Sequence, residues 1–161
     1  MSAGLSAGPA PADRVLLLTR VFDAPRSLVF KAWTDSEHLA HWFGPRGFEL
    51  TFCKIDLRPG GSYRFGMHSA EGTDHWLQGV YHEVVEPERL VCTYAWADAN
   101  GNATRPETVL ALTFAEKDGK TTMTLRQSVF ESVTACDMHR QGWTSSLDRF
   151  AEYVTRLDHS S

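Results

Sequence analysis

The sequence predicts an α+β fold in which a curved antiparallel sheet of about seven strands packs around one long C-terminal helix. Three observations support this prediction. Apolar residues near the C-terminus recur at helical spacing, and most of residues 48–130 alternates between apolar and polar in short runs bounded by turn residues. Residues 14–42 read as one strand followed by two short helices. The expected order of elements is therefore β-α-α-β6-α.

The first elements are a strand and a pair of short helices. Residues 14–22 are rich in Val and Leu, as in a strand, and lead into a turn that contains Pro25. Proline is favoured at a first helical position because its missing N–H costs nothing there, so we expect a helix over residues 25–33. Residues 37–42 are predicted to form a second helix, which ends before Gly44.

The middle of the chain is predicted to be a meander of antiparallel strands. The strands are expected at residues 48–57, 63–68, 75–85, 90–96, 110–114 and 123–129. The residues expected on their apolar faces are Phe48, Leu50, Phe52, Tyr63, Phe65, Met67, Leu90, Cys92, Tyr94, Trp96, Leu110, Leu112, Phe114, Met123, Leu125, Gln127 and Val129. A bulge is expected at residues 53–55, where strict alternation breaks.

The strand at residues 75–85 has two comparable faces, so its inward side is left open. One face carries Trp76 and Val80. The other carries Leu77 and Tyr81.

The C-terminal helix is predicted over residues 135–157. Its large apolar residues recur every three or four positions and therefore share one side: Trp143, Leu147, Phe150, Val154 and Leu157. At roughly 2 kcal/mol for each large side chain, burying that side contributes about 10 kcal/mol, so the helix needs the sheet as a partner surface. One helix cannot fill the hollow of a curved sheet, and we expect a pocket between them.

Length and charge limit the domain organisation and the partners. The 161 residues suit a single domain, placed at residues 13–158 after a disordered tail over residues 1–12 that is rich in Ala, Ser, Gly and Pro. A net charge of −4 without any Lys/Arg cluster argues against nucleic acid and anionic membranes as partners. No apolar run is long enough for membrane insertion, and we expect a monomer or a homodimer.

The cysteines point to a reducing compartment. Cys53, Cys92 and Cys136 cannot all pair within the chain, and they form no Cys-x-x-Cys motif. We therefore expect a cytoplasmic protein.

Several short motifs, in order along the chain, resemble those of a known superfamily. They are Arg-Val-Phe-Asp-Ala-Pro at residues 20–25, Val-Phe-Lys-Ala-Trp-Thr at 29–34, Trp-Phe-Gly-Pro at 42–45, Asp-Leu-Arg-Pro-Gly-Gly at 56–61, Gly-Val-Tyr at 79–81 and the stretch 142–154. The set is similar to the START-like superfamily (SRPBCC, birch-pollen-allergen fold). More narrowly, it resembles stand-alone homologues of the C-terminal domain of the heat-shock protein 90 ATPase activator. The resemblance covers nearly the whole chain after residue 13 and implies the helix-grip fold.

The resemblance implies several kinds of function. Members of the superfamily bind lipids, sterols, polyketides or hormones under the helix, some are cyclases or hydrolases, and some bind partner proteins. We favour a module that binds a small hydrophobic or aromatic ligand between sheet and helix. A chaperone-associated protein-interaction domain is the alternative, and a cyclase- or hydrolase-like enzyme ranks third.

Aromatic residues and their neighbours are the candidate ligand contacts, because flat rings give a large contact area with defined geometry. The candidates are Trp33, Trp42, Phe43, Phe65, Met67, Trp76, Tyr94, Trp96, Gln127, Met138 and Trp143. Trp42 and Phe43 are expected at the cavity mouth, since they end a short helix beside Gly44. Gln127 stands on an apolar face and needs a hydrogen-bond partner, which is a ligand, a water or a side chain such as Tyr94.

No metal, cofactor or catalytic residue is predicted. His38 and His41 could join His139 or Asp137 around a metal, but no cysteine or carboxylate stands at ligand spacing. The motifs of serine hydrolases, phosphate-binding loops and Cys-His enzymes are absent from the sequence. Scattered polar residues are interpreted as surface groups rather than acid–base groups: Arg64, His68, His75, Gln78, His82 and His139. A binding protein is therefore expected rather than an enzyme.

Overall fold

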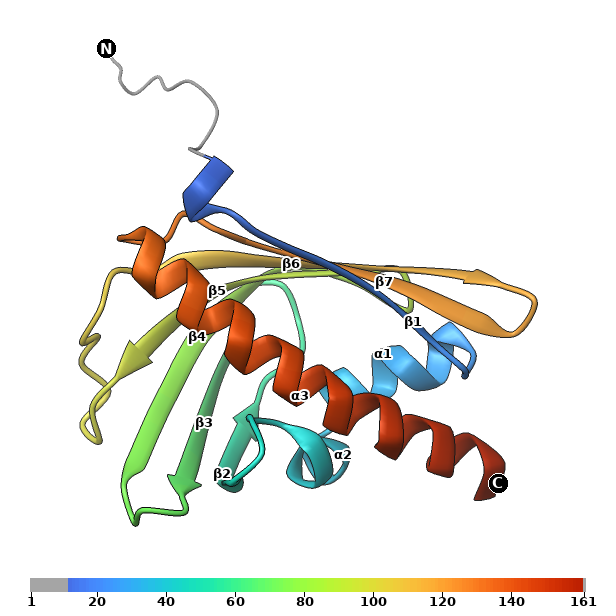
Figure 1. Cartoon of the computed structure of the whole chain (residues 1–161), viewed down its shortest axis with the longest axis horizontal. Helices are drawn as coiled ribbons and strands as arrows, with labels where there is room; N and C mark the ends of the chain where they lie inside the picture. Colours follow the sequence, from blue (N-terminus) through green and yellow to red (C-terminus); the bar gives the residue numbers. More distant parts are fainter. Residues whose placement is uncertain (1–11, 161) are drawn as a thin grey trace.

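One antiparallel sheet of seven strands curls around the C-terminal helix α3 (Figure 1). The computed structural model describes residues 12–160, so the disordered tail predicted at residues 1–12 lies outside the described residues apart from Ala12. The elements are η1 (Ala12–Arg14), β1 (Leu16–Phe22), α1 (Arg26–Thr34), α2 (Ser36–Trp42), β2 (Phe48–Ile55), β3 (Ser62–Ser69), β4 (Asp74–Val85), β5 (Arg89–Ala97), β6 (Thr108–Lys117), β7 (Lys120–Ser128) and α3 (Val133–Ser160). This order confirms the predicted β-α-α-β6-α arrangement and the helix-grip fold.

The strands lie in the order β1-β7-β6-β5-β4-β3-β2, so all pairs except β1–β7 join neighbours in sequence. β1 runs antiparallel to β7, with Leu18 opposite Leu125. The helices α1 and α2 lie beside the C-terminal half of α3, whereas the N-terminal half of α3 faces the sheet with only the short η1 beside it (Figure 1). The space beneath that first half is therefore left to side chains and loops.

The inward faces of the strands confirm the predicted alternation. Buried residues on these faces include Tyr63, Phe65, Met67, Leu110, Leu112, Phe114, Met123 and Leu125. In β4, whose faces the sequence did not rank, Leu77 and Tyr81 are buried while Val80 is exposed. The same alternation turns Trp76 toward the outer surface of the sheet.

The bulge predicted at residues 53–55 is wrong in position. The register shifts between Leu50, which pairs with Met67, and Phe52, which pairs with Gly66. An extra residue in one strand reverses the facing of the residues that follow it. Leu50 is therefore buried, whereas Phe52, predicted inward, is 43% exposed on the outer side.

The end of β7 and the start of α3 also differ from the prediction. β7 ends at Ser128, so Val129, predicted on its inner face, is 40% exposed. The helix α3 begins at Val133, two residues before the predicted start at residue 135, and the Ser132 hydroxyl caps it by accepting a hydrogen bond from the Ala135 amide. This added length carries the first turn of α3 over the end of the sheet.

Four of the five residues predicted on the inward side of α3 are buried against the sheet and the short helices: Trp143, Leu147, Phe150 and Val154. The fifth, Leu157, is only half-buried. Phe150 contacts Phe22 edge to face, with 4.8 Å between ring centroids. This apolar side anchors the C-terminal half of the helix.

Candidate functional site

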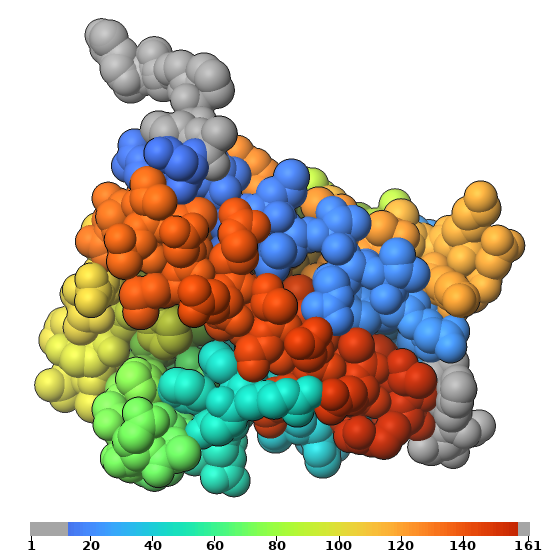
Figure 2. All heavy atoms as spheres, in the orientation of Figure 1, coloured from blue at the N-terminus to red at the C-terminus, as the bar shows by residue number. Residues whose placement is uncertain are grey.

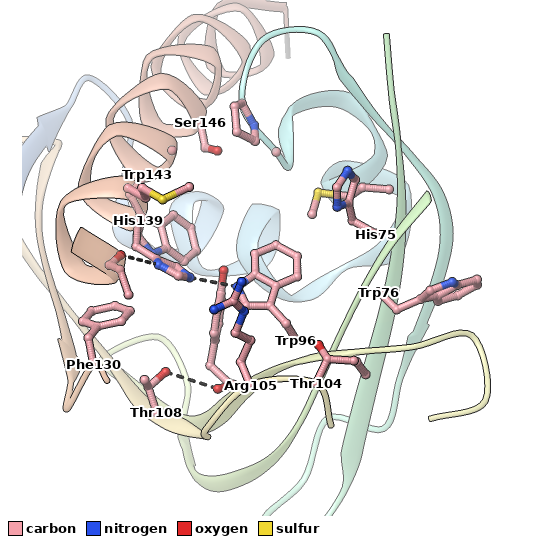
Figure 3. A pocket seen from close by; sticks show the side chains of 18 of the residues that line it. His75, Trp76, Trp96, Thr104, Arg105, Thr108, Phe130, His139, Trp143 and Ser146 are labelled. Atoms are coloured by element: carbon pink, nitrogen blue, oxygen red, sulfur yellow. Dashed lines mark hydrogen bonds between the residues drawn. The ribbon is translucent and has the colours of Figure 1, made fainter. Parts of the chain in front are cut away.

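A cavity of about 830 Å³ lies between the N-terminal half of α3 and the sheet (Figure 3). Its lining comes from α3, from strands β2 to β6, from the segment after α2, from the loop before β6 and from the segment between β7 and α3. The lining residues are Phe43, Gly44, Pro45, Phe48, Met67, Asp74, His75, Trp76, Tyr94, Trp96, Ala97, Thr104, Arg105, Pro106, Thr108, Phe130, Glu131, Ser132, Thr134, Ala135, Met138, His139, Gly142, Trp143 and Ser146. Figure 2 shows the segments that carry them meeting on one face, with the start of α3 in orange beside the yellow loop before β6.

Aromatic rings form the inner wall of the cavity. The Tyr94 ring centroid is 5.9 Å from that of Trp96 and 6.0 Å from that of Trp143. Phe43 adds an edge-to-face contact to Trp143, at 6.1 Å between centroids. Packed rings of this kind present a rigid, largely apolar surface to whatever enters the cavity.

Hydrogen bonds fix the Trp96 indole at this wall. Its Nε1 donates to Nε2 of His139 at 2.9 Å, and His139 Nδ1 lies 2.8 Å from the Ala135 carbonyl oxygen. An acceptor at Nε2 requires the proton on Nδ1, so the neutral tautomer of His139 satisfies both contacts. Burial lowers the pKa of His139 below its ordinary value of 6.5, an effect that the Ala135 carbonyl partly opposes.

The Trp143 indole is held in the same way by Gln127. Its Nε1 donates to Gln127 Oε1 at 2.8 Å, and Gln127 Nε2 donates to the Thr108 hydroxyl at 2.8 Å. Thr108 in turn donates to the Tyr94 carbonyl at 3.2 Å. The partners of Gln127 are therefore side chains, those of Trp143 and Thr108 rather than that of Tyr94. Gln127 is completely buried and lies behind the cavity wall.

The mouth of the cavity combines a charged pair with exposed apolar groups. Arg105 Nη1 lies 3.2 Å from Glu131 Oε1, and both side chains are exposed. Met138 of α3 is 66% exposed. The rim is therefore mixed in character, whereas the inner wall is aromatic.

The predicted ligand contacts divide into two groups. Phe43, Met67, Tyr94, Trp96, Met138 and Trp143 line the cavity, and Trp76 touches its rim. The Trp76 ring, however, lies on the outer face, 4.4 Å from the Arg64 guanidinium carbon, and it points away from the cavity in Figure 3. It is better described as part of an outer cation–π contact than as a ligand contact.

Four predicted contacts do not line the cavity: Trp33, Trp42, Phe65 and Gln127. Trp42, expected at the mouth, is completely buried and donates from Nε1 to the Ala32 carbonyl at 3.0 Å. Trp33 packs against Trp42, with 4.7 Å between ring centroids. Of the residues that end α2, only Phe43 reaches the cavity.

Two histidines interpreted as surface groups belong to the cavity instead. His75 and His139 are both half-buried and line it. The other polar groups in that set do lie outside it. His68 and His82 are exposed, and Arg64 donates to Gln78 at 2.6 Å on the outer face.

Sequence reasoning missed several cavity residues, among them Arg105, Thr108, Phe130 and Ser146. For one of them, the sequence does contain a pattern that predicts its position. Ser146 lies three residues after Trp143 and directly before Leu147, which places it on the inward side of the helix. The loop residues carried no such periodicity.

No metal centre is found within the described part of the chain. Over residues 12–160, no group of three or more His, Cys, Asp or Glu side chains is placed to hold an ion. His38 and His41 both contact the Tyr153 ring instead, with His41 stacked on it at 5.0 Å between centroids. Among the helices described, none is both long and apolar enough to cross a bilayer.

Comparison with a protein family adds to this geometry. The family described as "Activator of Hsp90 ATPase homolog 1-like protein" matches residues 23–155. This range runs from the turn after β1 into the last turns of α3. No curated protein matches the chain significantly.

Solved bacterial structures share the architecture. A protein from Chromobacterium violaceum has 29% identity and a TM-score of 0.76, with 88% of this chain and 96% of that chain covered. A protein from Silicibacter pomeroyi, titled AHSA1, has 24% identity, a TM-score of 0.78 and coverage of 89% and 99%. A protein from Arthrobacter aurescens reaches a TM-score of 0.81 at 20% identity, covering 89% and 87%. The last two likenesses show the shared fold.

Proposed function

The chain belongs to the family of activator of Hsp90 ATPase homolog 1-like proteins, and from that premise we propose that it binds a small, largely apolar ligand in the cavity under α3. The observation that carries this proposal is the cavity itself. At about 830 Å³ it falls within the range of small-molecule sites, and it has the expected lining of apolar and aromatic side chains with a few polar groups.

The wall of the cavity supports binding because it is already ordered. Trp96 is fixed by His139, and Trp143 is fixed by Gln127. A ligand that packs against rings held in this way does not have to order them, and the entropy cost of binding is reduced. The family resemblance to proteins that carry hydrophobic molecules under the same helix points in the same direction.

His139 is suited to holding the aromatic wall rather than to catalysis. Both of its ring nitrogens are engaged, one by Trp96 and one by the Ala135 carbonyl. A general acid or base needs a nitrogen free to exchange a proton with the substrate. We therefore assign His139 the role of orienting Trp96.

Native mass spectrometry and thermal shift test the proposal. The purified protein is analysed for co-purified molecules and is then heated with sterols, fatty acids and polycyclic aromatic compounds. We expect at least one class to raise the Tm, because a ligand that binds only the native state stabilises it. A protein that carries nothing and responds to none of these compounds would contradict ligand binding.

Gly142 offers a variant that fills part of the cavity. It lines the cavity within α3, and an added Cβ would meet only Pro45 Cγ, at 3.8 Å. Gly142→Leu is expected to remove the ligand-induced rise in Tm, because its side chain enters the cavity. Gly142→Ala is the matched control: it should keep ligand binding and raise stability by about 1 kcal/mol through helix propensity.

A second function, contact with a chaperone, is favoured by the family description and by exposed apolar residues at the start of α3. Val133 is 45% exposed and Met138 is 66% exposed. A steady-state ATPase assay of an Hsp90 chaperone, with and without this protein, separates the two functions. Stimulation that survives Gly142→Leu but is lost in Met138→Glu would favour the chaperone contact over the ligand.

A further inference from the structure

Ser146 is a buried polar group that faces the cavity without a partner. It projects inward from α3, is only 3% exposed and lines the cavity (Figure 3). Within residues 12–160, its hydroxyl makes no hydrogen bond, although the neighbouring Ser145 accepts one from the Arg46 amide at 2.9 Å. The Ser146 hydroxyl oxygen is not among the fully buried unpaired atoms of the described residues, so it is open to the cavity, where it can pair with a polar group of a ligand.

His75 supplies a second polar group on the sheet side of the same cavity. It lies on the inward face of β4, two residues before the buried Leu77. Its ring packs against Phe48, at 5.4 Å between centroids, and near Trp96, at 6.5 Å. In the described part of the chain its ring nitrogens have no hydrogen-bond partner, so one can donate to a ligand and the other can accept.

The charges around the cavity do not suit an anion. Its lining holds one arginine, Arg105, against two carboxylates, Asp74 and Glu131. Arg105 is paired with Glu131, and Asp74 is paired with His68 at 2.7 Å. An anionic ligand would have to displace Glu131 from Arg105, and it would lie near two carboxylates with one guanidinium to offset them.

We propose that the ligand is an uncharged molecule with a hydroxyl or carbonyl group that hydrogen-bonds to Ser146. This inference rests on the proposed function and adds the ligand's chemistry to it. His75 offers a second hydrogen bond to the same polar group or to a neighbouring one. The apolar body of the ligand packs against Tyr94, Trp96 and Trp143.

Three pyrene probes with the same ring system and different substituents test this chemistry. They are 1-methylpyrene, 1-pyrenemethanol and 1-pyrenecarboxylate, each held at trace concentration while protein is added and probe fluorescence is followed. We expect 1-pyrenemethanol to bind more tightly than either of the others. Because a neutral hydrogen bond contributes about one kcal/mol, Ser146→Ala should weaken 1-pyrenemethanol about fivefold and leave 1-methylpyrene unchanged.

Two further variants keep the test specific. His75→Phe retains an aromatic ring and removes both nitrogens, so it should also reduce the preference for the alcohol. Thr144→Ala removes a hydroxyl from the exposed side of α3 and should change no affinity. Thermal unfolding of each variant establishes that it is folded.

The outcomes separate this inference from the proposed function. If all three probes bind and Ser146→Ala weakens them equally or not at all, the hydrogen bond is refuted while ligand binding stands. Tightest binding of 1-pyrenecarboxylate would refute the uncharged ligand. If none of the probes binds, the proposed function fails and this inference fails with it.

Discussion

The Trp143 indole on α3 donates a hydrogen bond to the Gln127 amide on β7, with 2.8 Å between Nε1 and Oε1. Both side chains are buried, and Gln127 Nε2 in turn donates a hydrogen bond to the Thr108 hydroxyl of β6. Packing of apolar residues is non-directional, so it does not fix the rotation of a helix by itself. This buried polar link sets which side of α3 faces the sheet where the cavity begins.

Gln127→Leu is expected to lower the free energy of unfolding by about 2 kcal/mol, since it leaves the Trp143 N–H buried without an acceptor. Adding Trp143→Phe removes that unpaired donor. The double variant should therefore lose about 1 kcal/mol less than the sum of the two single variants. Urea unfolding of the four proteins measures this coupling. Strictly additive losses would show that the hydrogen bond contributes nothing.

Two neighbouring tryptophans provide a matched pair. Trp42 Nε1 donates to the Ala32 carbonyl at 3.0 Å, near the end of α1, where carbonyls lack intrahelical partners. The Trp33 Nε1 is buried with no hydrogen-bond partner among the described residues. We expect Trp42→Phe to destabilise the protein more than Trp33→Phe, by about 1–2 kcal/mol. Chemical denaturation gives both values, and an equal loss in the two variants would contradict the assignment.

Arg149 holds the segment after α2 against α3. Its Nη1 lies 2.8 Å from the Gly44 carbonyl oxygen and 3.2 Å from those of Pro45 and Phe48, all three of which line the cavity. Because hydrogen bonds from a charged donor contribute more than neutral ones, Arg149→Met should lower stability by about 1–3 kcal/mol. It should also weaken ligand binding by loosening the wall.

The control for Arg149→Met is the same substitution at an arginine that does not bond to the cavity wall. Arg126 is exposed on β7, and among the described residues it bonds to the Ser128 hydroxyl alone, at 3.0 Å. Arg126→Met should change stability by less than about 0.5 kcal/mol. Equal effects of the two substitutions, measured by urea unfolding, would attribute the Arg149 result to charge alone.

The layers of this fold were predictable because they follow from local periodicity. Alternation in β3 and β6 and the three-and-four spacing of Trp143, Leu147 and Phe150 each identify a buried side without any knowledge of the partner. A prediction from spacing alone fails where one strand of a pair contains an extra residue. The register shift before Phe52 turns its ring outward, although its spacing from Leu50 predicted the opposite.

The candidate site was less predictable, because its contacts join distant parts of the chain. The spacing of His139 gave no indication that it accepts a hydrogen bond from Trp96, which lies 43 positions away. A lone amide on an apolar face did predict that Gln127 needed a partner. The sequence could not identify that partner as Trp143, because the choice depends on how α3 rotates against β7.

His139 predicts how stability depends on pH. Burial holds its pKa in the folded protein below the ordinary value of 6.5. Above pH 6.5 the ring is neutral in both states and the shift contributes nothing. As the pH falls below 6.5, the unfolded chain binds a proton that the folded chain resists, so the free energy of unfolding decreases until the pH passes the folded pKa. NMR titration of the ring protons should show His139 titrating below pH 6.5.

Trp96→Phe tests whether the indole contributes to that depressed pKa. The Trp96 N–H donates to Nε2 only while His139 is neutral, so the hydrogen bond stabilises the unprotonated ring. Removing the donor should therefore move the pKa of His139 upward and lessen the loss of stability between pH 7 and pH 5, as measured by urea unfolding at each pH. An unchanged His139 titration in the variant would mean that burial alone keeps the His139 ring neutral. His139 would then hold Trp96 in place without Trp96 affecting the pKa of His139.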